Sequence, residues 1–276
     1  MKKTKKWITN ILLIIFALVF VVSAFMVGKY AVESVQANKQ KNALLDIKNQ
    51  SAGKPTDGQS VQPSASSGET GASEATEPAV PGILPEYAEL YALNEDLVGW
   101  IYVPDTNIDY PVMQTDREKD FYLHRDFYRE YSSHGMIYAD EKCDVNEPSD
   151  CVVLYGHNKD DGTMFGDMDF FWNENYYKAH KTLYFDTLTT HYEYEIVTVF
   201  NTTATLGEGF EYHLFVDAAD EAEFDEFVDT CKSLALYDTG VDAQYGDKLL
   251  LLSTCEYSHT NGRLVIVAKR VGEVKE

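Results

Sequence analysis

The stretch that most restricts the fold of this chain is KLLLLSTCEYSHTNGR, at positions 248–263. Its apolar run Leu249–Leu252 predicts a buried strand. The pair Asn261-Gly262 is a strong signal for a tight turn, and the apolar run Leu264–Ala268 follows it directly. We therefore expect two antiparallel strands that pair across a short polar loop.

Cys255 and Arg263 are the residues of this stretch that could carry chemistry. Antiparallel pairing would place them opposite or nearly opposite each other, with their Cβ atoms roughly 5 Å apart. A fixed cation beside a thiol favours the thiolate, which is the nucleophilic form. The stretch thus predicts a cysteine nucleophile, which also needs a proton donor for its leaving group and a group that stabilises an oxyanion.

The N-terminus predicts a membrane anchor. Four lysines lie within positions 1–6, and Ile11–Gly28 then contains no charged residue. At about 1.5 Å per residue this run is long enough to cross a bilayer. We expect a cytoplasmic basic tail at 1–6, a transmembrane anchor at 7–28, and the rest of the chain outside the cell. A cleaved signal peptide is the alternative, with Val35-Gln36-Ala37 as the cleavage site, but charged residues separate that site from the apolar run.

Composition divides the remainder into a spacer and a folded domain. Positions 29–82 are expected to form a juxtamembrane segment and a flexible linker, because 51–82 is dominated by Ser, Gly, Thr, Pro, Ala and Glu. Positions 83–276 alternate apolar runs with turn signals and should form the extracytoplasmic catalytic domain. The formal net charge of −22 argues against nucleic acid as a partner.

Short strand-like runs dominate this domain. Besides the two at the C-terminus, they are Val98–Val103, Ile108–Met113, Gly135–Ala139, Cys151–Tyr155, Thr182–Asp186 and Tyr192–Phe200. Helices are predicted at Pro85–Asn94, Phe170–Lys178 and Asp220–Leu236, the last with one apolar face and acidic residues in its first turn. Many short strands with few helices predict a mainly β domain, a barrel or a sandwich.

Seven histidines could supply the proton donor. His157 ends the apolar run CVVLYGH and begins a glycine-rich loop, where scaffolds present reactive side chains. His259, four residues after Cys255, is the alternative, although a histidine in a turn usually faces solvent. The others are interpreted as structural or solvent-facing: His124, His134, His180, His191 and His213. No His/Cys pair shows metal-ligand spacing, so we expect no metal and no cofactor.

The three remaining cysteines show no spacing that indicates a disulfide framework. Cys151 begins an apolar run and Cys231 lies on the apolar face of a predicted helix, so both are expected to be buried. A disulfide between Cys143 and Cys151 stays open.

Several of these motifs together resemble the sortases, and the class B members in particular. LSTCEYSHTNGRLVIVAKR is similar to the sortase signature T-L-x-T-C followed by an arginine that opens the next strand, with Leu251 in place of the first Thr. VVLYGHN (152–158) resembles the sortase histidine strand, and VGWIYVPDTNIDYPVMQ (98–114) and TMFGDM (163–168) resemble class B segments. So does the helix predicted before the cysteine strand. The resemblance covers about Glu86–Arg270.

The resemblance implies an eight-stranded sortase-type β-barrel with peripheral helices and a cysteine transpeptidase of Gram-positive cell envelopes. Its substrates would be surface proteins with a C-terminal sorting signal of LPxTG or NPxTx type. Cys255 would attack the carbonyl after the Thr of the signal, and Arg263 would stabilise the oxyanion or hold the peptide. His157 would protonate the departing amine and later deprotonate the incoming one, an amine of a peptidoglycan precursor. Between the two steps lies a thioacyl intermediate.

Three alternatives stay open at this stage. With water as the acceptor the chain would be a cysteine peptidase, and with a pilin lysine it would be a pilin-polymerising sortase. A non-catalytic wall-binding domain is the third, and the intact Cys255, His157 and Arg263 speak against it.

Ser253 and Glu256 flank the nucleophile and are candidates for contact with substrate. The alternative is that Ser253 forms hydrogen bonds within the sheet and that Glu256 is a solvated turn residue.

Overall fold

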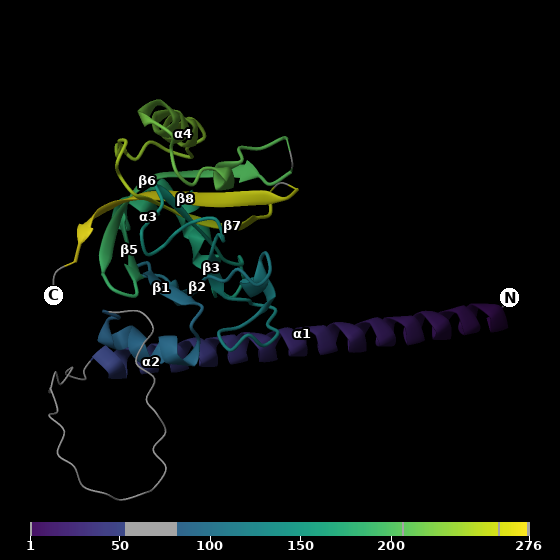
Figure 1. The fold of residues 1–276 in the computed structure, drawn as a ribbon. Coiled ribbons are helices and arrows are strands. Elements are labelled where there is room, and N and C mark those ends of the chain that lie inside the picture. The colour runs from purple at the N-terminus through teal and green to yellow at the C-terminus, as the bar shows by residue number, and fades with distance from the viewer. Residues whose placement is uncertain (1, 53–81, 206, 259, 275–276) are drawn as a thin grey trace, which may run out of the picture.

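The computed structural model describes residues 2–52, 82–205, 207–258 and 260–274, and its centre is a closed barrel of eight strands (Figure 1). The strand order around the barrel is β1-β2-β3-β4-β7-β8-β6-β5. The strands are β1 Leu97–Tyr102, β2 Asp109–Met113, β3 Ile137–Ala139, β4 Cys151–Tyr155, β5 Thr182–Thr187, β6 Tyr192–Thr203, β7 Leu249–Glu256 and β8 Gly262–Glu273. The eight-stranded barrel is confirmed, whereas most of the predicted linker lies outside the described residues.

β7 is the strand around which the site is built. It pairs in parallel with β4 along one edge and antiparallel with β8 along the other. Residues Leu249–Leu252 are each at most 1% exposed. A strand that is paired on both edges and buried on both faces carries a continuous apolar run, because neither face meets water.

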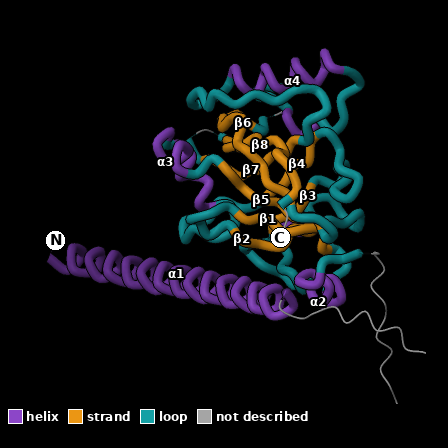
Figure 2. The backbone as a smooth tube through the Cα atoms, turned by 90° about the vertical axis from the view of Figure 1, so that its left-hand side faces the viewer, coloured by secondary structure: helices purple, strands orange, loops and turns teal. Residues whose placement is uncertain are grey.

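Helices lie on opposite sides of the barrel (Figures 1 and 2). On one side are α1, Lys2–Ala52, and α2, Pro85–Leu93; on the other is α4, Glu221–Ser233. The predicted helix Asp220–Leu236 is thus present but shorter. Asp220 caps its first turn by accepting a hydrogen bond from the Glu223 amide at 3.1 Å.

The helix predicted at Phe170–Lys178 is wrong in its bounds. A 3₁₀ segment, η2 Gly166–Trp172, precedes a separate helix, α3 Glu174–Ala179. Asn173 lies between them in an extended conformation, and its side chain accepts from the Asn175 amide. Asparagine competes well for backbone donors at a helix start, so it ends one element and caps the next. Two further 3₁₀ turns are η1 Phe121–His124 and η3 Tyr212–Leu214.

α1 continues without a break from the apolar run into the segment that contacts the barrel. Its apolar side chains between Leu12 and Val27 are exposed, and the helix is long and apolar enough to be a candidate membrane span. Nearer its C-terminus, Leu44 is 1% exposed and belongs to the domain core. The Nζ atom of Lys48 lies 4.5 Å from the ring centroid of Trp100. The single helix α1 therefore contains both the candidate membrane span and a segment that packs against the barrel.

All four cysteines are free thiols, so Cys143 and Cys151 are not paired. Cys151 and Cys231 are buried, as predicted.

His191 links α2 to the barrel through two carboxylates. Its Nδ1 lies 2.9 Å from Asp186 of β5, and its Nε2 lies 3.1 Å from Glu86 of α2. The hydrogen bond to Asp186 raises the pKa of His191 against the opposing effects of burial and of Lys48. Because the pKa in the folded state exceeds the unfolded value, this stabilisation is complete below about pH 6.5 and is lost as pH rises through the folded pKa.

We predict that His191→Gln lowers the free energy of unfolding at about pH 6 and lowers it much less at about pH 9. Denaturant unfolding of both proteins at the two pH values measures the difference. A loss of the same size at both values would contradict the ion-pair explanation.

Candidate active site

Cys255 and Arg263 are directly paired across β7 and β8, as the sequence predicted. The hairpin closes at Asn261, whose φ of 55° is in the left-handed region that asparagine tolerates. At Gly262, a Cβ atom would lie only 2.5 Å from the Glu256 carbonyl oxygen. The Asn-Gly pair therefore does more than reverse the chain: its glycine is the residue that lets β8 approach the end of β7.

His157 is aligned with Cys255 by the parallel pairing of β4 with β7. The last paired residues are Tyr155 and Ser253, and contact between the two chains continues beyond them. The Gly156 amide donates to the Ser253 carbonyl at 3.2 Å, and the Gly156 carbonyl accepts from the Thr254 hydroxyl at 2.7 Å. Continuing this register by one more residue brings His157 level with Cys255.

Asn158, the residue after His157, also holds the two segments together. Its side-chain amide donates to the Cys255 carbonyl at 3.0 Å and to Asp169 Oδ1 at 2.9 Å. The residue is 7% exposed. Asn158 therefore ties the loop that carries His157 to the strand that carries Cys255, a role that the sequence analysis missed. Its position directly after a candidate histidine was the only available signal.

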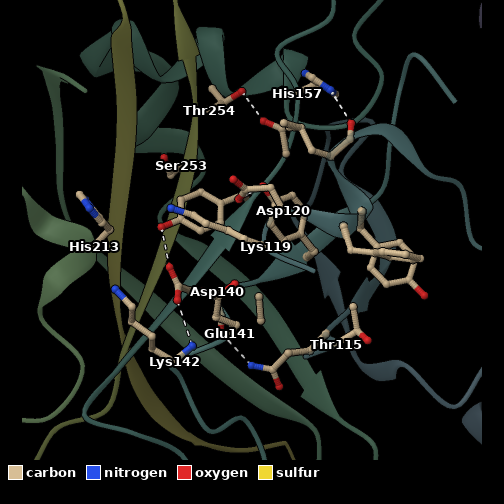
Figure 3. A pocket seen from close by; sticks show the side chains of 18 of the residues that line it. Thr115, Lys119, Asp120, Asp140, Glu141, Lys142, His157, His213, Ser253 and Thr254 are labelled. Carbon is tan, nitrogen blue, oxygen red and sulfur yellow. Dashed lines mark hydrogen bonds between the residues drawn. The ribbon is translucent and has the colours of Figure 1, made fainter. Parts of the chain in front are cut away.

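The three candidate residues His157, Cys255 and Arg263 line one cleft of about 430 Å³. His157 lies at one end of the view, near Thr254, and Asp120 and Asp140 lie further along the pocket (Figure 3). Each of these carboxylates accepts a hydrogen bond at 2.9 Å from a tyrosine, Asp120 from Tyr138 and Asp140 from Tyr155. Of the histidines interpreted as structural, His124 and His213 also line the cleft.

The ring of His157 is held by a backbone carbonyl. Its Nε2 lies 2.8 Å from the Leu123 oxygen. A carbonyl oxygen only accepts hydrogen bonds, so Nε2 carries the hydrogen and Nδ1 keeps the lone pair in the neutral ring. Burial lowers the pKa of His157 to about 4, and the imidazole is therefore neutral at neutral pH. Within the described residues no hydrogen bond joins this ring to the Cys255 thiol. Hydrogen bonds between catalytic groups are often long or poorly aligned before substrate binds.

Arg263 presents a cation to the cleft. Its Nη1 donates to the carbonyl oxygens of Asn261 at 3.3 Å and Gly262 at 2.9 Å. Among the described residues, no carboxylate lies within ion-pair distance of this guanidinium. Its charge can therefore act on a bound carbonyl oxygen or oxyanion.

Ser253 and Glu256 differ in their placement. Ser253 lines the cleft but is 2% exposed, and its hydroxyl lies 2.6 Å from that of Tyr212. Glu256 is 8% exposed and accepts a hydrogen bond from the Ser258 amide at 2.5 Å, so it is not a solvated turn residue. His259, the alternative proton carrier, lies outside the described residues.

In residues 2–52, 82–205, 207–258 and 260–274, no group of three His, Cys, Asp or Glu side chains could hold a metal ion.

We predict that Asn158→Ala lowers the free energy of unfolding by about 1–3 kcal/mol, because it removes the side-chain donor shared by the Asp169 carboxylate and the Cys255 carbonyl. Denaturant unfolding measures the loss. Asn175→Ala is the matched control, since Asn175 is exposed on α3. A loss for Asn158→Ala no larger than that of the control would show that the bridge does not hold the two segments.

Comparisons with known proteins agree with this architecture. A family model described as Sortase domain matches residues 101–271. The chain is 33% identical over 189 residues to Sortase B of Listeria monocytogenes, an alignment that covers 67% of this chain and 74% of that protein. It is 31% identical over 189 residues to Sortase B of Staphylococcus aureus, with 68% and 75% covered.

Solved structures give the same result. The crystal structure of sortase B from B. anthracis in complex with AAEK1 matches with a TM-score of 0.68 at 28% identity, covering 87% of this chain and 98% of that one. The Staphylococcus aureus sortase B-substrate complex matches with a TM-score of 0.64 at 30% identity, covering 71% and 88%.

Proposed function

Because this chain belongs to the sortase family of cysteine transpeptidases, in class B, we propose that it joins surface proteins bearing a C-terminal sorting signal to an amine of the cell wall. The observation that carries the proposal is the alignment of three side chains in one cleft. His157 lies two residues beyond the end of β4, Cys255 is the next-to-last residue of β7, and Arg263 is the second residue of β8. A nucleophile, a proton carrier and a cation on three adjacent strands are the groups that acyl transfer requires.

The protonation state of His157 defines the order of proton transfers. With a pKa of about 4 the imidazole is neutral near pH 7, so it accepts the proton of the Cys255 thiol as the sulfur attacks the carbonyl carbon of the signal's Thr. The imidazolium then protonates the departing amine as the C–N bond breaks, and a thioester remains on Cys255. When the acceptor amine attacks, the neutral imidazole takes its proton and the C–S bond breaks.

Arg263 is assigned to the oxygen of the scissile carbonyl, or to the peptide that carries it. It is paired with Cys255 across the two strands and lines the same cleft, which supports a role at the carbonyl that the sulfur attacks. A fixed cation in a half-buried site is most valuable where negative charge develops, as on the oxygen of a tetrahedral intermediate.

The substrates follow from the family and from the membrane end of the chain. A sorting signal of LPxTG or NPxTx type would occupy the cleft, and an amine of a peptidoglycan precursor would be the acceptor. The lysines before the apolar run favour a cytoplasmic N-terminus and an extracytoplasmic barrel, anchored by α1. The same residues would serve a peptidase that uses water, or a sortase that uses a pilin lysine.

We predict that the full-length chain converts a sorting-signal peptide to a ligated product in an acceptor-dependent manner. Mass spectrometry of reactions with and without an amine acceptor measures ligated and hydrolysed product. Cys255→Ala should abolish both, because the thioester cannot form. Hydrolysis alone at every acceptor concentration would favour the peptidase, and full activity of Cys255→Ala would contradict the mechanism.

Arg263→Lys should lose most of the activity, about tenfold or more in kcat/KM, because an ammonium does not replace the planar fork of a guanidinium. The comparison of kcat and KM separates the two assignments. A loss in kcat indicates stabilisation of the oxyanion, and a rise in KM alone indicates peptide binding. Wild-type kinetics in this variant would show that Arg263 has neither role.

A further inference from the structure

The hydrogen bond between His157 and the Leu123 carbonyl has a consequence for the proposed reaction. A neutral imidazole exists as two tautomers, and a carbonyl that accepts from one nitrogen selects a tautomer and fixes the orientation of the ring. At 2.8 Å the contact is of normal length, and it is the bond drawn from His157 in Figure 3. Serine and cysteine hydrolases give this orienting task to a third side chain, commonly Asp or Asn.

We propose that the Leu123 carbonyl is the orienting partner of His157 and that Ser133–Gly135, docked on α1, holds this carbonyl in place. The inference rests on the proposed function, in which His157 carries the protons. It assigns positioning roles to residues that lie outside the three candidate catalytic residues and that lack a catalytic side chain.

Gly135 is packed directly against the carbonyl in question. Its φ of +61° is in the left-handed region, and an added Cβ would lie 2.4 Å from the Leu123 oxygen and 2.7 Å from the Tyr122 oxygen. The next residue, Met136, donates its amide to the Tyr122 carbonyl at 2.9 Å. A side chain at position 135 must therefore displace backbone atoms, and the nearest of them is the oxygen that holds His157.

Ser133 connects this packing to two other parts of the molecule. Its hydroxyl donates to Glu33 Oε2 of α1 at 2.8 Å. Its carbonyl accepts from Lys159 Nζ at 2.6 Å, and Lys159 lies two residues after His157. Ser133 therefore contacts the loop that follows His157, through Lys159, and lies two residues before Gly135, which packs against the Leu123 carbonyl.

A second contact joins the segment Ser133–Gly135 to α1. The ring of Tyr30 stacks on His134, with 6.4 Å between the ring centroids, and His134 is 1% exposed. Tyr30 and Glu33 come soon after the apolar run that ends at Gly28. The part of α1 next to the candidate span is therefore the part that supports the His157 site.

The chemical consequence concerns which nitrogen of His157 acts. With the hydrogen held on Nε2 by Leu123, Nδ1 is the atom available to take the proton of Cys255. Release of the carbonyl allows the ring to rotate and to populate both tautomers, and only part of the population is then competent. The loss should appear mainly in kcat rather than in KM, because the change acts on the proton carrier and removes no side chain that lines the cleft.

Gly135→Ala tests the contact, and Gly240→Ala is its matched control. Gly240 also has a left-handed φ, +71°, but an added Cβ there meets nothing within 4 Å. Both variants therefore carry the backbone cost of alanine in this region, and only Gly135→Ala displaces the carbonyl. The readouts are the tautomer of His157 by ¹⁵N NMR of the histidine-labelled full-length chain in detergent, together with kcat and KM for the sorting-signal peptide.

We expect wild type and Gly240→Ala to show a single Nε2–H tautomer. Gly135→Ala should show mixed tautomers and lose about tenfold to hundredfold in kcat with little change in KM. A single Nε2–H tautomer with normal kcat in Gly135→Ala would overturn the inference.

A second pair of variants tests the docking on α1 and covers the case in which Gly135→Ala fails to fold. Glu33→Ala removes the acceptor of the Ser133 hydroxyl, whereas Glu33→Gln keeps an acceptor oxygen in the same place. The alanine variant should lower kcat and mix the tautomers, and the glutamine variant should restore both. Equal behaviour of the two variants, with a single tautomer in each, would contradict the role of α1.

His157→Gln separates this inference from the proposed function. If His157→Gln keeps full activity, the assignment of His157 as proton carrier is wrong. If His157→Gln is inactive while the Gly135 and Glu33 variants behave as wild type, the proposed function stands and the orienting role of Leu123 is wrong.

Discussion

The pairing of β7 with β4 on one edge and with β8 on the other is the constraint on which the site depends. Side chains of a strand alternate between its two faces, so a slip of one residue would turn Cys255 away from the cleft. The register is held by the apolar run Leu249–Leu252, which is buried on both faces, and by the close approach of Gly262 to Glu256. Packing far from the cleft thus determines where the thiol lies.

The same constraint brings a histidine into the cleft that the cysteine lines. His157 enters the site from the end of β4, and its burial disfavours the imidazolium and lowers its pKa to about 4. A backbone carbonyl then decides which nitrogen carries the hydrogen. α1 adds a second layer, because it combines a candidate membrane span with contacts to Ser133 and His134. The candidate membrane span and the contacts to these two residues thus belong to one helix.

The sequence predicted the features that depend on local patterns. The strand–turn–strand at the C-terminus, the helix near Asp220 and the pairing of Cys255 with Arg263 followed from apolar runs, acidic residues in a first helical turn and an Asn-Gly turn. The parallel pairing of β4 with β7 did not, because it joins segments far apart in the chain and leaves no periodic signal. The break at Asn173 was missed because the apolar pattern continues across it.

Contacts made by backbone atoms could not be predicted from the sequence either. The Leu123 carbonyl and the close approach of Gly135 have no signature in side-chain chemistry, so neither could be found before the structure. Asn158 and Tyr212 are polar residues whose partners lie on distant strands. The side chains proposed to react could be identified by pattern and resemblance, whereas the groups that orient them required the fold.

The central claim is that the acyl group passes through a thioester on Cys255. The most direct measurement is the mass of the full-length chain after incubation with a sorting-signal peptide in the absence of an acceptor amine, followed by peptide mapping. The account predicts an added mass equal to the part of the peptide that ends at the signal's Thr, located on Cys255 and released when an amine is added. Turnover of the peptide with no such adduct, or with an adduct on another residue, would contradict it.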